Sequence, residues 1–456
     1  MLKRYLQPFI ILILAGLIAS CSDDDGNYEA LVIKANADAT EVAQNSDKII
    51  NVLGNDSHIP NVGVLTVQNP EHGTAEVLDS SITPNNPSDD TIFYTPSTNF
   101  SGVDTFAYTI CDASGNCAVA TVTVTVTPIS SVVFNLDDVP YGTLSEYQFF
   151  DGEMKNLEPS NGVVPYELNS ALFSDYAQKK RFVWMPSGSK ATYDSDFTPL
   201  QFSIGSVIIK NFYYENVQPS NSQRIIETRL MYLTAEGWNF AEYVWNDDQT
   251  EATFTTQGSF TNIEWLENGI TNAVNYRIPS RTECFACHNK FGTPLPIGPK
   301  PQNLNRDLNY SDGTFNQLQQ WIELGYLEDN LPAAIVSTVK WDDETLDLDL
   351  RVRSYLDINC GHCHSDESYC EYRPMRYAFN DNDEDINKGV CVEPDTQIAG
   401  TSHIVVPGNT DASVLRFRLN SIEEQNRMPL LGRTLTHEEG VRLIEEWINS
   451  LNGECD

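Results

Sequence analysis

Two short motifs of the form Cys-x-x-Cys-His are the part of the chain best suited to chemistry. Residues 284–288 read Cys-Phe-Ala-Cys-His, and residues 360–364 read Cys-Gly-His-Cys-His. This pattern is typical of haem c attachment, in which two thiols form thioethers to the porphyrin and the following His ligates the iron. The sequence therefore predicts two haem c groups, held by Cys284, Cys287 and His288 and by Cys360, Cys363 and His364.

Paired cysteines have two other common uses, a four-Cys zinc site and a reversible dithiol. Zinc-binding pairs usually lie about 15–20 residues apart, and the two pairs here are separated by a much longer stretch of chain. A dithiol of thioredoxin type needs no His after it, and His is rare here, at 7 of 456 residues. A His directly after both pairs favours haem over these alternatives.

The second motif has a partner for the sixth position of its iron. Apolar residues at helical spacing over 346–356 lead into it, and residues 436–439 predict a capping box that begins a C-terminal helix. Met428 lies just ahead of that helix. This order resembles class I cytochrome c, which implies Met428 as the distal ligand opposite His364. A Met that fills the core is the alternative, and His362 is expected to be a bystander.

The first motif has no such partner nearby. Residues 289–314 contain neither Met nor His, and the chain before Cys284, which includes Pro279, predicts no helix. The sixth position is expected to hold water, no ligand, or one of five side chains: Lys290, Lys300, Met375, His403 or His437. For the last three, a structural role is the other interpretation. An open iron could bind peroxide or a small gas molecule, which is the basis of an enzyme hypothesis.

The N-terminus predicts export from the cytoplasm. Lys3 and Arg4 form a charged region, and residues 9–18 are apolar but too short to span a bilayer, so residues 1–20 are predicted to be a signal peptide. The end of this segment, Ile-Ala-Ser-Cys, resembles the lipobox of bacterial lipoproteins, which implies a lipid on Cys21. An ordinary signal peptide with an incidental Cys is the alternative. We expect a lipoprotein anchored to the outer membrane, facing the periplasm or the cell surface.

Acidic residues dominate the chain and limit its partners. An acidic linker follows Cys21 over residues 21–30, and its Ser-Asp-Asp-Asp run resembles the surface-export signal of Bacteroidetes lipoproteins. The net charge is −36, from 64 acidic and 28 basic residues. This excess argues against nucleic acid, whose binding depends on neutralising phosphates. It suits a redox partner protein with a basic patch.

The sequence of residues 31–128, on the N-terminal side of these motifs, predicts an all-β module. Residues 105–110 and 120–126 alternate in strand fashion between turns rich in Gly, Asn and Pro. The segments 52–56 and 99–106 resemble bacterial Ig-like or cadherin-like modules of surface proteins, which implies an Ig-like sandwich. Some such modules bind calcium through Asn-Asp pairs; for Asn55 and Asp56 an ordinary turn is the alternative.

The remainder predicts one more β domain and a helical region. Residues 145–275 are rich in aromatic and β-branched residues and contain no His and no Cys, so we expect a second β-sandwich. Residues 276–335 are expected to form the first haem-binding segment. Residues 340–456 are expected to form a mostly α cytochrome c-like domain that holds the second haem.

Two disulfides are expected in an exported chain of this kind. Cys111 and Cys117 flank a short turn between two predicted strands. Cys370 and Cys391 bracket an acidic loop at 381–385, and a bridge between them would pin it. Cys455 is then left over.

Several phrases over residues 144–450 resemble an uncharacterised family of exported bacterial dihaem proteins. They include Leu-Phe-Ser-Asp-Tyr-Ala at 172–177, Pro-Ser-Arg-Thr-Glu-Cys at 279–284 and Arg-Met-Pro at 427–429. The resemblance implies architecture and cofactor but no reaction. We expect an exported dihaem c-type cytochrome that transfers electrons. A peroxidase-like haem enzyme and a surface adhesion or scaffold protein acting through the Ig-like module are the alternatives.

Overall fold

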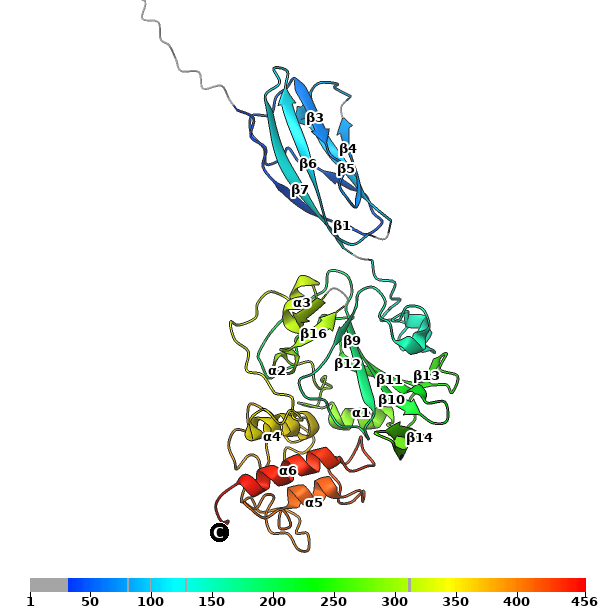
Figure 1. Ribbon diagram of the computed structural model, residues 1–456, viewed down its shortest axis with the longest axis vertical. Helices are drawn as coiled ribbons and strands as arrows, with labels where there is room; N and C mark the ends of the chain where they lie inside the picture. The colour runs from blue at the N-terminus through cyan, green and yellow to red at the C-terminus, as the bar shows by residue number, and fades with distance from the viewer. Residues whose placement is uncertain (1–31, 80–81, 99, 128, 311–312) are drawn as a thin grey trace, which may run out of the picture. The chain divides into compact units, whose positions relative to one another are not determined.

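The computed structural model divides the chain into two units, residues 1–128 and residues 129–456, which are described separately (Figure 1). The structure describes residues 32–456 except 80–81, 99, 128 and 311–312. The predicted signal peptide, the lipidation of Cys21 and the acidic linker lie outside these residues. None of the helices within the described ranges is both long and apolar enough to cross a membrane.

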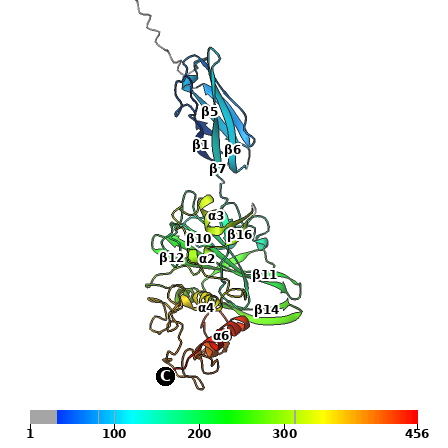
Figure 2. The same ribbon diagram turned by 60° about the vertical axis from the view of Figure 1, so that its left-hand side comes forward.

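The first unit is a β-sandwich, as predicted for residues 31–128. One sheet has the order β1-β7-β6-β3 and the other the order β2-β5-β4. Figure 2 shows β1, β6 and β7 of the first sheet and β5 of the second. Inward-facing Tyr94, Tyr108 and Val122 are fully buried between the sheets, which explains the alternation seen in the sequence. The strands are β1 Asp38–Ala43, β2 Lys48–Ile50, β3 Gly63–Val67, β4 Gly73–Asp79, β5 Asp90–Pro96, β6 Gly102–Asp112 and β7 Cys117–Thr127.

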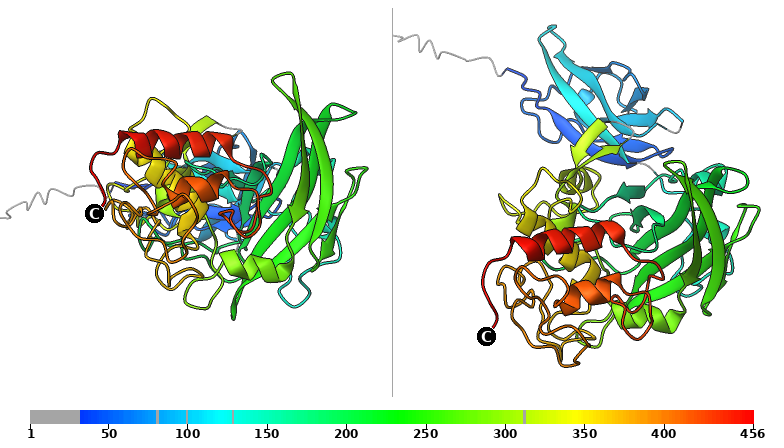
Figure 3. Two further views of the ribbon diagram at one scale, coloured as in Figure 1. Left: turned by 90° about the horizontal axis from the view of Figure 1, so that it is seen from below. Right: turned by 60° about the horizontal axis from the view of Figure 1, so that its bottom comes forward.

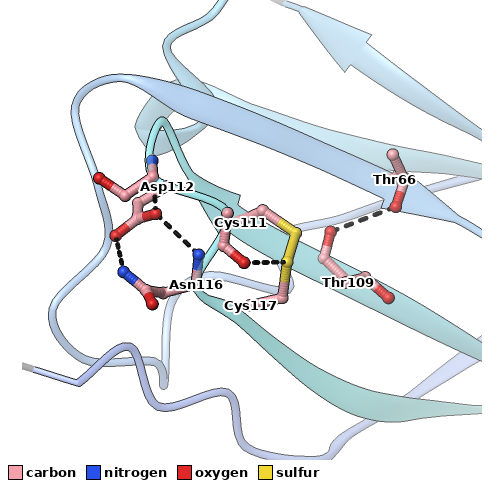
Figure 4. The surroundings of a disulfide bond; sticks show 8 residues. Thr66, Thr109, Cys111, Asp112, Asn116 and Cys117 are labelled. Carbon is pink, nitrogen blue, oxygen red and sulfur yellow. Dashed lines mark hydrogen bonds between the residues drawn. A yellow bond between two sulfur atoms is a disulfide. The ribbon is translucent and has the colours of Figure 1, made fainter.

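The hairpin between β6 and β7 carries the disulfide that its spacing predicts. Cys111 and Cys117 lie directly opposite each other in the antiparallel register and are bonded to each other (Figure 4). In the turn, both carboxylate oxygens of Asp112 accept hydrogen bonds from Asn116, at 2.9 and 2.8 Å. The turn therefore fixes the register that brings the two cysteines together.

The Asn-Asp pair of this unit is used in internal hydrogen bonds. Asp56 accepts from the backbone of Asn36 at 2.7 Å and from the hydroxyl of Tyr108 at 2.8 Å. Asn55 donates to the carbonyl oxygen of Ala37 at 3.0 Å. These bonds give the pair a structural role in the turn, and calcium binding there stays a prediction.

The middle of the chain is rich in strands, as expected, but its strands belong to one sheet. Eight antiparallel strands are ordered β13-β12-β11-β10-β14-β15, with β9 pairing β10 and β8 pairing β9. Figure 3 shows this sheet curving along one side of the second unit. The strands are β8 Val163–Tyr166, β9 Gln178–Trp184, β10 Val207–Val217, β11 Ser222–Thr234, β12 Gly237–Trp245, β13 Ala252–Thr255, β14 Ser259–Glu267 and β15 Ile270–Ile278.

The two faces of the sheet pack against different parts of the chain. One face, which includes Tyr243, packs on the irregular segment before β8, which contains the 3-10 helices η2 (Leu144–Tyr147) and η3 (Met154–Asn156). The opposite face, which includes Phe240, packs against residues that follow the sheet in sequence, among them Trp321. This second face is therefore covered by the region that contains the two Cys-x-x-Cys-His motifs, so the expected segments 276–335 and 340–456 form one unit with the sheet.

The prediction that residues 340–456 are mostly helical is wrong. Of the described residues between Gly361 and Val414, none lies in a helix, and this stretch is rich in Asp, Asn, Gly and Pro, which favour turns. Figure 3 shows helices α4, α5 and α6 packed beside such loops. The helices of the second unit are α1 Arg281–Cys287, α2 Pro301–Leu304, α3 Gln317–Glu323, α4 Leu348–Leu356, α5 Val414–Asn420 and α6 Glu438–Ser450, and the hairpin β16 Asp307–Tyr310 with β17 Gly313–Asn316 precedes α3.

The terminal helix α6 is present, but the capping box predicted for residues 436–439 is not. His437 occupies the N-cap position and its side chain makes no capping bond. Glu439 instead accepts a hydrogen bond from the hydroxyl of Tyr176, 3.1 Å away. The buried face of α6 includes Ile444 and Trp447, at the spacing the sequence predicts.

The predicted bridge between Cys370 and Cys391 is also wrong. Cys391 is bonded to Cys455, and Cys370 is a free, buried thiol. The backbone N–H of Cys370 instead donates to the carbonyl oxygen of Cys363, which holds it beside the second motif. The bridge therefore ties the end of the chain, beyond α6, to the loop that precedes α5.

Candidate functional site

The first motif lies on the short helix α1, which the sequence did not predict. The helix begins after Ser280, where Ser280 and Glu283 form a capping box. The Ser-x-x-Glu spacing at 280–283 is a sequence signal that could have predicted this helix. His288 follows at the C-cap, and its Nδ1 lies 2.8 Å from the carbonyl oxygen of Leu295. A carbonyl only accepts, so Nδ1 carries the hydrogen and Nε2 keeps a free electron pair for a metal. Burial also lowers the pKa of His288 to about 4, which keeps the ring neutral.

The second motif follows α4 through a π-helical turn, Asp357–Gly361, which contains Cys360. The π-helical turn is a form often found at functional sites. Gly361 packs against the backbone of Tyr377 and Ala378 so closely that a Cβ would lie 3.1 Å from both. His364 is buried, its ring meets Tyr377 edge-on at 5.4 Å, and its Nδ1 has no hydrogen-bond partner among the described residues. Burial lowers the pKa of His364 to about 4, so it too is neutral.

The two motifs converge in space. Sulfur atoms of Cys287 and Cys363 and a ring nitrogen of His362 all lie within 4.8 Å of one another. Cys284 and Cys360 are outside this group, and all four motif cysteines are free thiols. His362, expected to be a bystander, is therefore at the contact between the motifs, and its place inside the second motif was the only signal for this.

Each motif borders its own cavity in the second unit. The first cavity is lined by Cys284, Cys287 and His288, and its far wall is the sheet. The sheet residue Phe240 contacts His288 with ring centroids 5.2 Å apart. The second cavity is lined by residues of the other motif together with two methionines: Cys360, Cys363, His364, Met375 and Met428. Both cavities are bordered by Cys287 and His362, so they are neighbours.

The five candidates for the sixth position of the first site lie in different places. His437 is the one that borders the first cavity, and its ring stacks on Phe173 at 4.1 Å while Nδ1 lies 3.0 Å from the hydroxyl of Tyr355. Met375 borders the second cavity instead. The other three, Lys290, Lys300 and His403, border neither. These contacts already give His437 a structural role.

The loop that carries Met428 is held by a buried arginine. Arg433 is 3% exposed, and its guanidinium donates to the carbonyl oxygens of Arg418, Ser421, Met428 and Leu435. The backbone N–H of Met428 also donates to the carbonyl oxygen of Arg418 at 3.0 Å. Sequence reasoning missed Arg433, because nothing local distinguishes it from a surface arginine.

A second anchor ties this loop to the segment before β9. Both carboxylate oxygens of Asp175, which is 2% exposed, accept from the backbone N–H of Thr434, at 2.7 and 2.9 Å. Asp175 also accepts from the backbone N–H of Leu435 at 2.8 Å. Arg433 and Asp175 therefore both hold the loop that brings Met428 to the second cavity.

Comparison with known proteins identifies the first unit only. Residues 29–125 match the family of bacterial Ig domains. No curated protein matches the chain. Among solved structures, extracellular cadherin domains of protocadherin gamma B7 share 7% identity over 54% of this chain and 76% of that one, with a TM-score of 0.17. A Bacteroides ovatus protein of a mixed-linkage glucan utilization locus shares 10% identity over 54% of this chain and 66% of that one, with a TM-score of 0.12. The N-terminal part of the chain, residues 29–125, is a bacterial Ig domain.

Proposed function

We propose that residues 129–456 bind two haem c groups covalently and transfer electrons. The observation that carries this proposal is that each Cys-x-x-Cys-His motif borders one of two neighbouring cavities with a neutral His, which is buried for His364 and half-buried for His288. Cys284 and Cys287 would attach the first haem, and Cys360 and Cys363 the second. Bound haem supplies one-electron chemistry, and the chain's residues set its potential and access.

The residues around the cavities fit this role. The hydrogen bond from His288 to a backbone carbonyl is the outer contact that fixes the tautomer and orientation of a metal-bound His. In the second cavity, Met428 and His364 border one space, which suits a thioether opposite an imidazole. Such a pair raises the potential and closes the iron to other ligands. The second haem is therefore the better suited to carry electrons.

The convergence of the motifs supports electron transfer between the two sites. Groups attached at Cys287 and Cys363 would be neighbours, because the sulfur atoms lie within 4.8 Å of each other. Haems held by these two cysteines would supply one-electron chemistry at neighbouring positions of the chain's second unit. We therefore propose that the second site relays electrons to or from the first.

The proposal also includes the location and the partner. We propose an exported lipoprotein anchored to the outer membrane by Cys21, with the bacterial Ig domain placed between the anchor and the haem unit. The net charge of −36 suits a redox partner with a basic patch. An adhesion or scaffold role for the Ig domain is compatible with this arrangement. The match of residues 29–125 to bacterial Ig domains supports such a role for the first unit.

A haem enzyme is the second candidate. Among the described residues, Met231 on the sheet is the methionine that borders the first cavity, so an open iron there requires that the Met231 thioether is not a ligand. Glu242 borders the cavity, is 5% exposed and lies 3.4 Å from Arg229. An acid of this kind could move a proton for a small molecule bound at an open iron, as the peroxidase-like alternative requires.

A metal site is the competing use of the same residues. Cys287, Cys363 and His362 present thiolate and imidazole donors within 4.8 Å, a set that suits zinc. Cys284 and Cys360 stand outside the group, so the four-Cys zinc site considered from the sequence is not what the structure assembles. Metal analysis of the purified protein tests this use directly, and about one zinc per chain with no haem would replace the haem proposal.

Visible spectra test the proposed function. The full chain is produced in a host that matures haem c, and intact mass gives the number of covalent haems. We expect two haems per chain. Spectra of the oxidised, reduced and carbon monoxide-treated protein then separate the two candidates. If carbon monoxide does not change the spectrum, both irons are closed to exogenous ligands and the protein is an electron carrier. If carbon monoxide changes the spectrum of about half the haem, the first iron is open and the enzyme becomes the favoured candidate. A chain without covalent haem overturns the proposal.

A further inference from the structure

One line of charged side chains crosses the sheet wall of the first cavity. In the antiparallel register, Arg181 on β9 is opposite Lys210 on β10, Lys210 is opposite Arg229 on β11, and Arg229 is opposite Glu242 on β12 (strands in Figure 1). All four border the first cavity. The neighbouring row on the same face, two residues along each strand, is apolar and consists of Ile208, Met231 and Phe240.

The three cations of this row are not balanced. Arg181 pairs with Glu167 at 2.7 Å, and Arg229 pairs with Glu227. Within the described part of the chain, no carboxylate lies within salt-bridge distance of Lys210, whose Nζ lies 4.8 Å from the centre of the Phe212 ring. Lys210 therefore sits between two guanidinium groups, and like charges directly opposite each other on a sheet destabilise it.

The acid at the end of the row does not supply the missing charge. Glu242 lies 3.4 Å from Arg229, on the far side of that residue from Lys210. Burial and then the nearby Glu227 raise the pKa of Glu242 well above its usual range, which disfavours its charged form. Burial, and then the nearby Arg181, lower the pKa of Lys210 well below its usual range, as expected for an amine that lies between two guanidinium groups with no anion beside it among the residues that the structure describes.

The row also has hydrogen-bond donors to spare. Nη2 of Arg181 is buried and has no acceptor among the described residues, whereas Nε of Arg229 lies 3.4 Å from the Glu242 carboxylate without forming a hydrogen bond to it. Arg181 itself is 4% exposed. Buried donors normally have partners, so a missing acceptor and a missing negative charge point to the same kind of group, an anion with oxygen atoms.

We propose that Arg181, Lys210 and Arg229 form a carboxylate-binding site in the first cavity, centred on Lys210. Phe240 contacts His288 and lies opposite Met231, which is two residues from Arg229 on β11, so the site lies on the strands next to the residue that contacts the predicted iron ligand. The carboxylate has two possible sources. It is either a propionate of the first haem, in which case the inference rests on the proposed function, or a dissolved carboxylate that enters the cavity.

The test uses the full chain with Lys210→Met, which removes the charge, and Lys210→Arg, which keeps it. The control is Lys190→Met, because Lys190 is an exposed lysine that does not border the cavity. Sodium acetate is titrated at constant ionic strength against chloride, and the thermal midpoint and the visible spectrum are recorded. The reduction potentials of both haems are measured on the same samples.

A dissolved carboxylate predicts a saturable acetate response in the native chain, weakened at least tenfold by Lys210→Met and kept by Lys210→Arg. A propionate predicts no acetate response. In that case Lys210→Met lowers the potential of the first haem only, because losing a nearby cation favours the oxidised iron. Lys210→Gln repeats both measurements if Lys210→Met does not fold.

The proposal is overturned if the Lys210 variants match Lys190→Met in acetate response and in both potentials. Its failure is distinct from failure of the proposed function. If intact mass shows no covalent haem, the dihaem function is refuted. The effect of acetate on the thermal midpoint still tests the carboxylate-binding site in that case.

Discussion

Replacing Arg433 by Met tests whether this buried side chain holds the loop of the predicted distal ligand. Its guanidinium donates at 2.8–3.1 Å to four carbonyl oxygens, those of Arg418, Ser421, Met428 and Leu435. Methionine fills a similar volume but donates to none of them. The variant would leave four backbone acceptors without their partner in a site where little water enters.

The size of the effect follows from the burial of this group. A hydrogen bond from a charged donor contributes about 1.5–3 kcal/mol, and removing one partner of a buried charged network costs about 3–5 kcal/mol. The bonds share one side chain, so their contributions do not add. We expect the free energy of unfolding of the second unit to fall by about 3–5 kcal/mol, which lowers its thermal midpoint by roughly 4–7 °C.

Scanning calorimetry of the full chain measures this loss, with Arg442→Met as the matched control. Arg442 is an exposed arginine on α6 that pairs with Glu439 at 3.4 Å, and such pairs contribute about 0.5 kcal/mol. The potential of the second haem is recorded in parallel and should fall as Met428 loses its fixed position. A thermal midpoint and a potential equal to those of Arg442→Met would show that Arg433 does not organise the loop.

Three further predictions use other parts of the second unit. Met428→Ala should lower the reduction potential of the second haem and leave the first unchanged, as measured by redox titration, because a thioether ligand favours the reduced iron. Cys455→Ser should lower the free energy of unfolding by about 4 kcal/mol, since the Cys391–Cys455 bridge closes a loop with a sequence separation of 64. Burial, and then Arg181, lower the pKa of Lys179 to about 7. The unfolded chain therefore binds the extra proton between about pH 7 and 10, so stability rises with pH in that window, and Lys179→Met should reduce the rise in urea melts.

Each of these has an outcome that contradicts it. Equal potentials in Met428→Ala and the native protein would remove Met428 as a ligand. A Cys370→Ser variant should be milder than Cys455→Ser, and the reverse order would mean that Cys391 pairs with Cys370 after all. An unchanged pH slope in Lys179→Met would show that this amine is solvated in the folded protein.

Features set by neighbouring residues were predictable from the sequence. The two Cys-x-x-Cys-His motifs are complete within five residues each, and the alternation in β6 and β7 predicted a hairpin whose turn brings Cys111 and Cys117 together. The apolar face of α6 followed from helical spacing. The cap at Ser280 was equally local, and reading it would have predicted α1.

Features that depend on long-range packing were not predictable in the same way. The partner of Cys391 depends on where the end of the chain lies, and Cys370 was the nearer choice in sequence. The capping box predicted at 436–439 does not form because the Glu439 carboxylate accepts a hydrogen bond from Tyr176, which is far away in the chain. The mostly α domain expected for residues 340–456 has no helix among the described residues between Gly361 and Val414, which form turns instead.

The sequence by itself determined which residues can bind a cofactor, because attachment chemistry needs only a few residues at fixed spacing. Only the tertiary structure decided what surrounds them. It brought Cys287 and Cys363 within 4.8 Å, placed Met428 beside the second motif, and aligned Arg181, Lys210 and Arg229 across three strands. Such contacts arise from strand register and from the burial of distant apolar segments against each other, and no stretch of neighbouring residues encodes them.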